Sequence, residues 1–113
     1  MDCIFCKIIA GEIPSKKVYE DEDCLAFYDV APQAPVHVLV VPKEHIENMN
    51  GVNADNFRVF AKMPLILRAV AYELGIAEKG YRIINNCGAD GGQTVNHLHF
   101  HLLGGTALPP GLV

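Results

Sequence analysis

The segment spanning residues 96–102 alternates strictly between polar and apolar side chains. Its histidines are His97, His99 and His101, and its apolar residues are Leu98, Phe100 and Leu102. In a β-strand, residues i, i+2 and i+4 project from one face, about 6.6 Å between successive members. The alternation therefore predicts a strand over residues 95–103, with the three histidines in a row on one face and the apolar side chains facing the core.

Apolar runs and chain breakers predict the other short elements. A short helix is expected over residues 3–9, ended by Gly11 and Pro14. Strand-like runs at residues 16–20 and 24–29 flank an acidic turn and predict a hairpin. A β-branched run at residues 36–41, ended by Pro42, predicts a central strand, and residues 81–86 predict another.

A long amphipathic helix is expected over residues 54–74, with Asn53 as its N-cap and Gly75 as its C-cap. Its apolar stripe has spacings of three and four residues and consists of Phe60, Met63, Leu67, Val70 and Leu74. Pro64 lies inside this helix and predicts a kink or a local break. Off the stripe lie Val59, Leu65 and Ile66, which indicate either a second buried face against another subunit or scattered surface residues.

The order of these elements is two strands, a third strand, a helix and two more strands. It lacks regular βαβ alternation, so it predicts an α+β fold with a mostly antiparallel sheet. The 113 residues correspond to a single domain, residues 1–113.

Charge and hydropathy exclude two classes of protein. Nine Lys and Arg against thirteen Asp and Glu leave a formal net charge of −4, which argues against binding to a nucleic-acid polymer. The sequence contains no run of ~18 apolar residues, so no transmembrane helix is expected. The N-terminus, Met1-Asp2-Cys3, lacks the basic and apolar regions of a signal peptide, so a cytoplasmic location is expected.

The pair Cys3 and Cys6 has the CxxC spacing of metal and redox sites. In a reducing compartment this pair indicates metal binding or redox chemistry more than a structural disulfide. The spacing alone does not distinguish these two possibilities.

The histidine row has two chemical interpretations. Alternate histidines are suitable ligands for a hydrolytic metal, or one of them acts as a nucleophile beside stabilising donors. Nearby glycines at positions 88, 91 and 92 let backbone N–H groups approach an anion. Because Asn86, Gln93 and Thr94 add neutral donors, the surroundings favour phosphate chemistry.

Several motifs in the same order resemble the histidine triad superfamily. Residues 97–103 are similar to its His-x-His-x-His signature, and residues 3–9, 29–37, 42–46 and 91–96 match further segments. The similarity is closest to the Hint branch of histidine triad nucleotide-binding proteins, in its bacterial zinc-containing form. The resemblance implies a five-stranded antiparallel sheet with one long helix, usually paired into a homodimer.

The resemblance also implies an activity. Hint-like enzymes bind AMP-like purine nucleotides and cleave nucleoside phosphoramidates through a covalent nucleotidyl-histidine. By position His99 would be the nucleophile, with His101 and His37 serving the phosphate and the leaving group. The nucleotide-binding positions would be Asn86, Gly92, Gln93 and Thr94 at the phosphate, Asp29 at the ribose, and Phe5, Ile8, Phe27, Val30 and Leu39 around the base. A structural zinc site would consist of Cys3, Cys6, His45 and His97.

Three alternatives remain open at this stage. Related members of the superfamily are dinucleoside polyphosphate hydrolases or nucleotidyl transferases, and another possibility is a non-catalytic nucleotide-binding regulatory module. A metallohydrolase would instead use His97, His99 and His101 as ligands. The tail after Gly105 is short and lacks the tryptophan of eukaryotic Hint proteins, which leaves the preferred leaving group undetermined.

Overall fold

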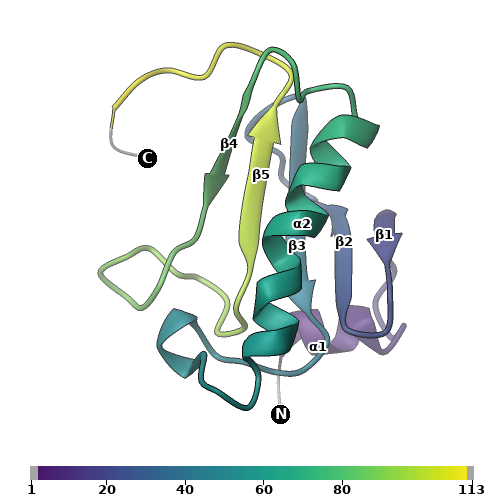
Figure 1. Ribbon diagram of the computed structural model, residues 1–113, viewed down its shortest axis with the longest axis vertical. Helices are drawn as coiled ribbons and strands as arrows, with labels where there is room; N and C mark the ends of the chain where they lie inside the picture. The colour runs from purple at the N-terminus through teal and green to yellow at the C-terminus, as the bar shows by residue number, and fades with distance from the viewer. Residues whose placement is uncertain (1–2, 112–113) are drawn as a thin grey trace.

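The computed structural model describes residues 3–111 and has an α+β architecture (Figure 1). Its elements are α1 (Ile4–Ile9), β1 (Lys17–Glu20), β2 (Cys24–Tyr28), β3 (Val36–Pro42), the 3-10 helix η1 (Met49–Gly51), α2 (Phe57–Glu73), β4 (Tyr81–Ile84) and β5 (Phe100–Gly104). The strands form one sheet in the order β1-β2-β3-β5-β4, and every neighbouring pair is antiparallel. The predicted five-stranded sheet, long helix and short N-terminal helix are confirmed.

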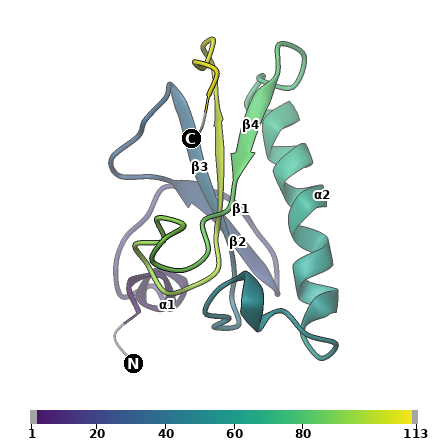
Figure 2. The same ribbon diagram turned by 90° about the vertical axis from the view of Figure 1, so that its left-hand side faces the viewer.

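The two helices lie on opposite sides of the sheet (Figure 2). On the α2 side, alternate residues of β3 such as Val38 and Val40 pack with Met63, Leu67 and other helix residues. On the α1 side, Leu39 and Val41 pack with Phe5 and Ile8. Because β2 and β3 bury both faces, their sequences are apolar almost throughout rather than alternating.

The long helix α2 differs from its predicted bounds at the N-terminus. It begins at Phe57 with Asn56 as the N-cap residue, not at residue 54 behind Asn53. The Asn53 side chain instead accepts the backbone N–H groups of Asp55 and Asn56, which forms a turn before the helix. At the other end, α2 stops at Glu73 with Leu74 as its C-cap residue, one residue earlier than expected, and Gly75 follows with a positive φ of 74°.

Pro64 does not break α2, which is continuous from Phe57 to Glu73. The proline ring lies on the exposed side, whereas Met63, Ile66 and Leu67 beside it are buried against the sheet. Packing of that face keeps the helix intact despite the lost backbone hydrogen bond.

The apolar residues off the main stripe separate into two groups. Val59 and Ile66 belong to the same core as the stripe, so they form no second buried face. Leu65 is 68% exposed and remains on the surface.

Strand ends near the histidines are also shorter than predicted. β4 ends at Ile84 rather than residue 86, and β5 begins at Phe100 rather than residue 95. The backbone N–H of Leu98 donates to the Ile46 carbonyl at 2.6 Å, which lies beyond the end of β3, so the ladder does not extend to this point. The predicted alternation still holds, because Leu98 and Leu102 lie in the α2-side core while His97 and His99 contact Phe5 on the α1 side.

Within the described residues 3–111, no helix is long and apolar enough to cross a membrane.

Candidate active site and metal centre

His99 immediately precedes β5 and lies on the α1 side of the sheet, and its side chain is only 4% exposed. Its Nδ1 lies 2.7 Å from the His97 carbonyl oxygen. A carbonyl only accepts hydrogen bonds, so Nδ1 carries the proton and Nε2 keeps a free lone pair. Burial lowers the pKa of His99, which favours the neutral ring. His99 is therefore held in the tautomer that a nucleophile requires.

His37 and His101 form a directed chain of hydrogen bonds on the same face. The backbone N–H of Gln33 donates to His37 Nδ1 at 3.0 Å, so the proton of neutral His37 resides on Nε2. That Nε2 lies 2.9 Å from His101 Nδ1 and donates to it. His101 in turn carries its proton on Nε2 and presents it as a donor.

The proximity of His37 and His101 follows from strand register. Leu39 of β3 pairs with His101 of β5, and His37 lies two residues from Leu39 on the same face. Burial, followed by repulsion from His99 and His37, lowers the pKa of His101 to about 4. Burial also lowers the pKa of His37, although Asp29, whose Oδ2 lies 3.5 Å from His37 Nε2, opposes this effect. Both rings are consequently neutral at pH 7.

A cavity of about 290 Å³ opens beside His99 and His101. The expected base-binding residues line it, namely Phe5, Ile8, Phe27, Val30 and Leu39. Val30 is 96% exposed and lies at the rim, whereas the other four are buried. Asp29 and Thr94 also line this cavity, so the structure places an apolar wall, a carboxylate and two imidazoles around one space.

The remaining expected phosphate-side residues organise the loop between β4 and β5 and do not line this cavity. Asn86 donates through Nδ2 to the Gly91 carbonyl at 2.7 Å. The Gln93 amide donates to the carbonyls of Glu47 and Val95 and accepts the Gly88 N–H. Gly92 has φ of 82°, a conformation that favours glycine. These contacts shape the loop that leads into Thr94.

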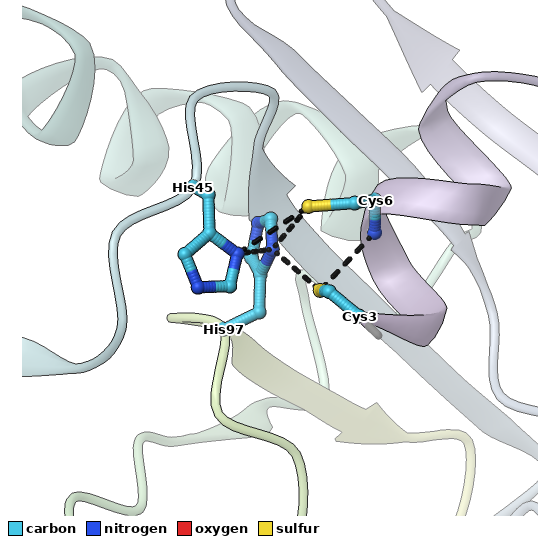
Figure 3. A group of neighbouring side chains, drawn as sticks. All are labelled: Cys3, Cys6, His45 and His97. Carbon is cyan, nitrogen blue, oxygen red and sulfur yellow. Dashed lines mark hydrogen bonds between the residues drawn. The ribbon is translucent and has the colours of Figure 1, made fainter. Parts of the chain in front are cut away.

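The four expected metal ligands converge at the N-terminus of α1 (Figure 3). Their donor atoms all lie within 4.8 Å of one another, with Cys3 Sγ 3.2 Å and His45 Nδ1 3.2 Å from His97 Nδ1, and Cys6 Sγ 3.3 Å from His45 Nδ1. A tetrahedron with bonds of ~2.0–2.3 Å has edges of roughly 3.3–3.8 Å, which is similar to this spacing. The Cys2His2 set can hold a metal ion, and its ligand types are those of zinc sites.

The orientation of His97 supports metal binding by this set. Its Nε2 lies 2.8 Å from the Pro42 carbonyl, so Nε2 carries the proton and Nδ1 presents a lone pair toward the two cysteines. Burial, the largest effect, lowers the pKa of His97 to about 4. The ring is therefore neutral, as metal ligation requires.

A second group, Asp29, His37 and His101, also has ligand atoms within 4.8 Å. Here the tautomer opposes metal binding, because the Gln33 N–H occupies His37 Nδ1 and leaves a proton on the Nε2 that would face the metal. This group is suited to donating a hydrogen bond through His101 instead.

The metallohydrolase alternative required the three histidines of the row to share one metal. His97 Nδ1 faces the cysteines, His99 Nδ1 binds a carbonyl, and His101 Nδ1 pairs with His37. Among the described residues, the groups able to hold a metal do not combine these three rings. The geometry therefore disfavours that alternative.

Two contributors to the site were not identified from the sequence. The Gln33 backbone N–H sets the His37 tautomer, and Asn85 donates through Nδ2 to the His99 carbonyl at 2.9 Å. A backbone group leaves no mark in a sequence pattern. Asn85 could have been found only by aligning β4 and β5 in their register.

The HIT domain family model matches residues 10–108. An uncharacterized HIT-like protein of Synechococcus elongatus is 54% identical over 112 residues, covering 97% of each chain. A solved structure, a HIT family hydrolase from Clostridium thermocellum, superposes with a TM-score of 0.95 at 52% identity, covering 99% of this chain and 97% of that one. A histidine triad protein from Clostridium difficile has a TM-score of 0.94 at 49% identity, with coverage of 99% and 97%. The chain therefore belongs to the HIT domain family.

Proposed function

We propose that this protein is a purine nucleotide-binding hydrolase that cleaves nucleoside phosphoramidates through a covalent intermediate on His99. The observation that carries the proposal is the buried neutral imidazole of His99, whose Nδ1 is fixed by the His97 carbonyl. It faces a cavity with an apolar wall and a carboxylate, as a nucleoside requires. The similarity to a structure named as a HIT family hydrolase supports the same class of reaction.

The cavity suggests how a nucleotide would be oriented. The base would lie among Phe5, Ile8, Phe27 and Leu39, with Val30 at the rim. Asp29 would accept hydrogen bonds from the ribose hydroxyls, because a carboxylate has more lone pairs than the one at Oδ1 that accepts the Ala31 N–H. The α-phosphate would then lie near Thr94, His99 and His101, beside the loop that contains Asn86, Gly92 and Gln93. Such a site binds one nucleotide through neutral donors despite the net charge of −4.

The hydrogen-bond directions support a role for His101 and His37 as hydrogen-bond donors in this reaction. His99 Nε2 attacks phosphorus and forms an N–P bond while the bond from phosphorus to the amine breaks. The departing nitrogen takes its proton from solvent. The neutral His101 ring would donate a hydrogen bond through Nε2–H to the phosphate, and His37 Nε2–H would hold His101 in that tautomer through Nδ1. Water then attacks phosphorus and the N–P bond to His99 breaks. The nucleoside monophosphate is released, and the proton of the water passes to solvent.

We also propose that Cys3, Cys6, His45 and His97 hold zinc in a structural role. A closed Cys2His2 site contributes folding energy and has no open position for substrate. It would attach α1, which carries Phe5 and Ile8 of the cavity wall, to the segment before β5.

A homodimer is proposed from the exposed apolar surface. Leu65 and Tyr72 of α2 are 68% and 62% exposed, and Ile83 of the edge strand β4 is 45% exposed. Exposed apolar residues on a helix and on an edge strand are typical of subunit contacts. Light scattering after size exclusion should give twice the monomer mass, and Ile83→Asp should shift the protein toward monomer. A monomeric wild type contradicts this part of the proposal.

The activity is tested with a panel of adenosine 5′-phosphoramidate and diadenosine polyphosphates, assayed with wild type and His99→Ala. We expect phosphoramidate turnover by wild type, a loss of at least ~1,000-fold in the variant, and AMP affinity within a few fold. Wild type quenched rapidly in alkali, where the N–P bond of a nucleotidyl-histidine survives, should contain a nucleotidyl adduct on His99 by mass spectrometry. Faster polyphosphate cleavage would favour the related hydrolases, and AMP binding with turnover far below ~1 per second would favour a regulatory binding module.

A further inference from the structure

The backbone of His99 lies just outside the regular sheet. On one side, the β3–β5 ladder reaches Val40 opposite Phe100, and on the other, the β4–β5 ladder ends at Ile84 opposite His101. The His99 carbonyl is therefore beyond the last backbone pair with β4. A residue at the end of a ladder has more conformational freedom than one within it.

A side chain takes the place of the missing backbone partner. Asn85, the first residue after β4, donates through Nδ2 to the His99 carbonyl at 2.9 Å. The bond is partly buried, where a hydrogen bond is less weakened by water than one at the surface. Asn85 thus extends the β4–β5 pairing by one rung at the residue that carries the proposed nucleophile.

Two further backbone hydrogen bonds restrain the residues before His99, and the β3–β5 ladder begins after it at Phe100. The Leu98 N–H donates to the Ile46 carbonyl, and the His97 N–H donates to the Val95 carbonyl. Together with Asn85 they fix the peptide units on both sides of His99. The direction of its Cα–Cβ bond, and hence of Nε2, depends on both peptides.

We propose that Asn85 is a positioning residue for His99, acting through the His99 carbonyl and without contacting substrate. This inference rests on the proposed function of His99. Its amide has no acid–base role, because an Asn side chain does not titrate. Its effect is on orientation, so loss of the bond should lower the rate of attack more than nucleotide binding.

The test compares Asn85→Leu with Arg82→Met as a matched control. Leu keeps approximately the shape of Asn and removes the donor. Arg82 also lies on β4 and also donates to a backbone carbonyl, that of Pro109 at 2.8 Å, but this bond lies in the C-terminal tail. Each variant therefore loses one bond from side chain to backbone, and only one of these bonds holds His99.

For adenosine 5′-phosphoramidate we expect kcat to fall about tenfold in Asn85→Leu, with KM and AMP affinity within twofold. This is less than the ~100-fold loss that follows a ~1 Å misplacement, because the Leu98 contact is retained. Arg82→Met should retain wild-type kcat. Asn85→Asp should show a decrease at least as large as Asn85→Leu, since a carboxylate repels the His99 carbonyl.

A second readout does not depend on turnover. In long-range ¹H–¹⁵N spectra of the histidine rings, wild-type His99 should show a proton on Nδ1 protected from exchange by the His97 carbonyl. Asn85→Leu should shift this signal and speed its exchange, whereas Arg82→Met should not. If Asn85→Leu lowers the melting temperature but leaves both kcat and this signal unchanged, the residue is only structural and the proposal is overturned.

The two readouts separate this proposal from the proposed function. A wild type that fails to cleave phosphoramidate would refute the proposed function, and the ring signal of His99 would still test Asn85. Normal wild-type turnover, with equal kcat and an unchanged His99 ring signal in Asn85→Leu, would refute the role of Asn85 alone.

Discussion

The backbone carbonyl of His97 accepts a 2.7 Å hydrogen bond from Nδ1 of His99, while Nδ1 of the His97 ring faces the sulfur of Cys3. One residue thus contributes its main chain to the proposed nucleophile and its ring to the proposed zinc site. The two sites share a structural element, so a change in the metal ligands is expected to alter the position of the nucleophile.

Loss of a metal ligand should therefore affect both sites. Protein purified without added metal should contain about one zinc per chain, and Cys6→Ser should abolish it, lower the melting temperature and reduce phosphoramidate turnover. The control is Cys87→Ser, because Cys87 lies outside the ligand group. Metal analysis, thermal denaturation and kinetics provide the measurements. Zinc retained at full stoichiometry in Cys6→Ser would contradict the proposed ligand set.

Acid should destabilise the protein through His101. Its pKa is about 4 in the folded protein and about 6.5 when unfolded, so between these values the unfolded chain binds more protons. The contribution of neutral His101 to the free energy of unfolding is fully present above pH 6.5. It decreases as the pH falls toward 4, by up to about 3 kcal/mol. Urea denaturation of wild type and His101→Asn at pH 7 and pH 4.5 tests this. The variant should lose less stability on acidification, and equal losses would contradict the expectation.

Pro64→Ala should stabilise the protein. Pro64 is exposed inside α2 and lacks the N–H that would complete the helix ladder. Alanine restores that bond, which stabilises the helix, but it also raises the conformational entropy of the unfolded chain, which opposes folding. We expect a net gain of about 1–3 kcal/mol in the free energy of unfolding. Ala69→Gly, at another exposed position of α2, should instead lose about 1 kcal/mol. Destabilisation by Pro64→Ala would mean that the proline is required for the helix geometry.

Asp29 should determine recognition of the sugar. Wild type should bind AMP more tightly than 2′,3′-dideoxy-AMP, by about 10- to 100-fold if two hydrogen bonds to a carboxylate are lost. In Asp29→Asn this ratio should approach one, because the charged acceptor is absent. Calorimetric titration of both ligands with both proteins gives the four affinities. An unchanged ratio would place the ribose away from Asp29.

The order of elements and the division of the histidine segment into two faces could be predicted from the sequence. Strict alternation sends Leu98 and Leu102 to one side of the chain and His97 and His99 to the other, even where the segment leaves the ladder. The grouping of Cys3, Cys6, His45 and His97 came from the family resemblance, and the structure brings these four together.

The roles of the individual ring atoms depended on the tertiary structure. His37 and His97 have the same side chain, yet Gln33 N–H makes Nδ1 of His37 an acceptor while the Pro42 carbonyl leaves Nδ1 of His97 free for a metal. The same is true of Asn85, whose contact with His99 arises from strand register. A residue sequence states which groups are present, but backbone donors and acceptors become partners only when distant segments fold together, and these partners decide where each proton lies.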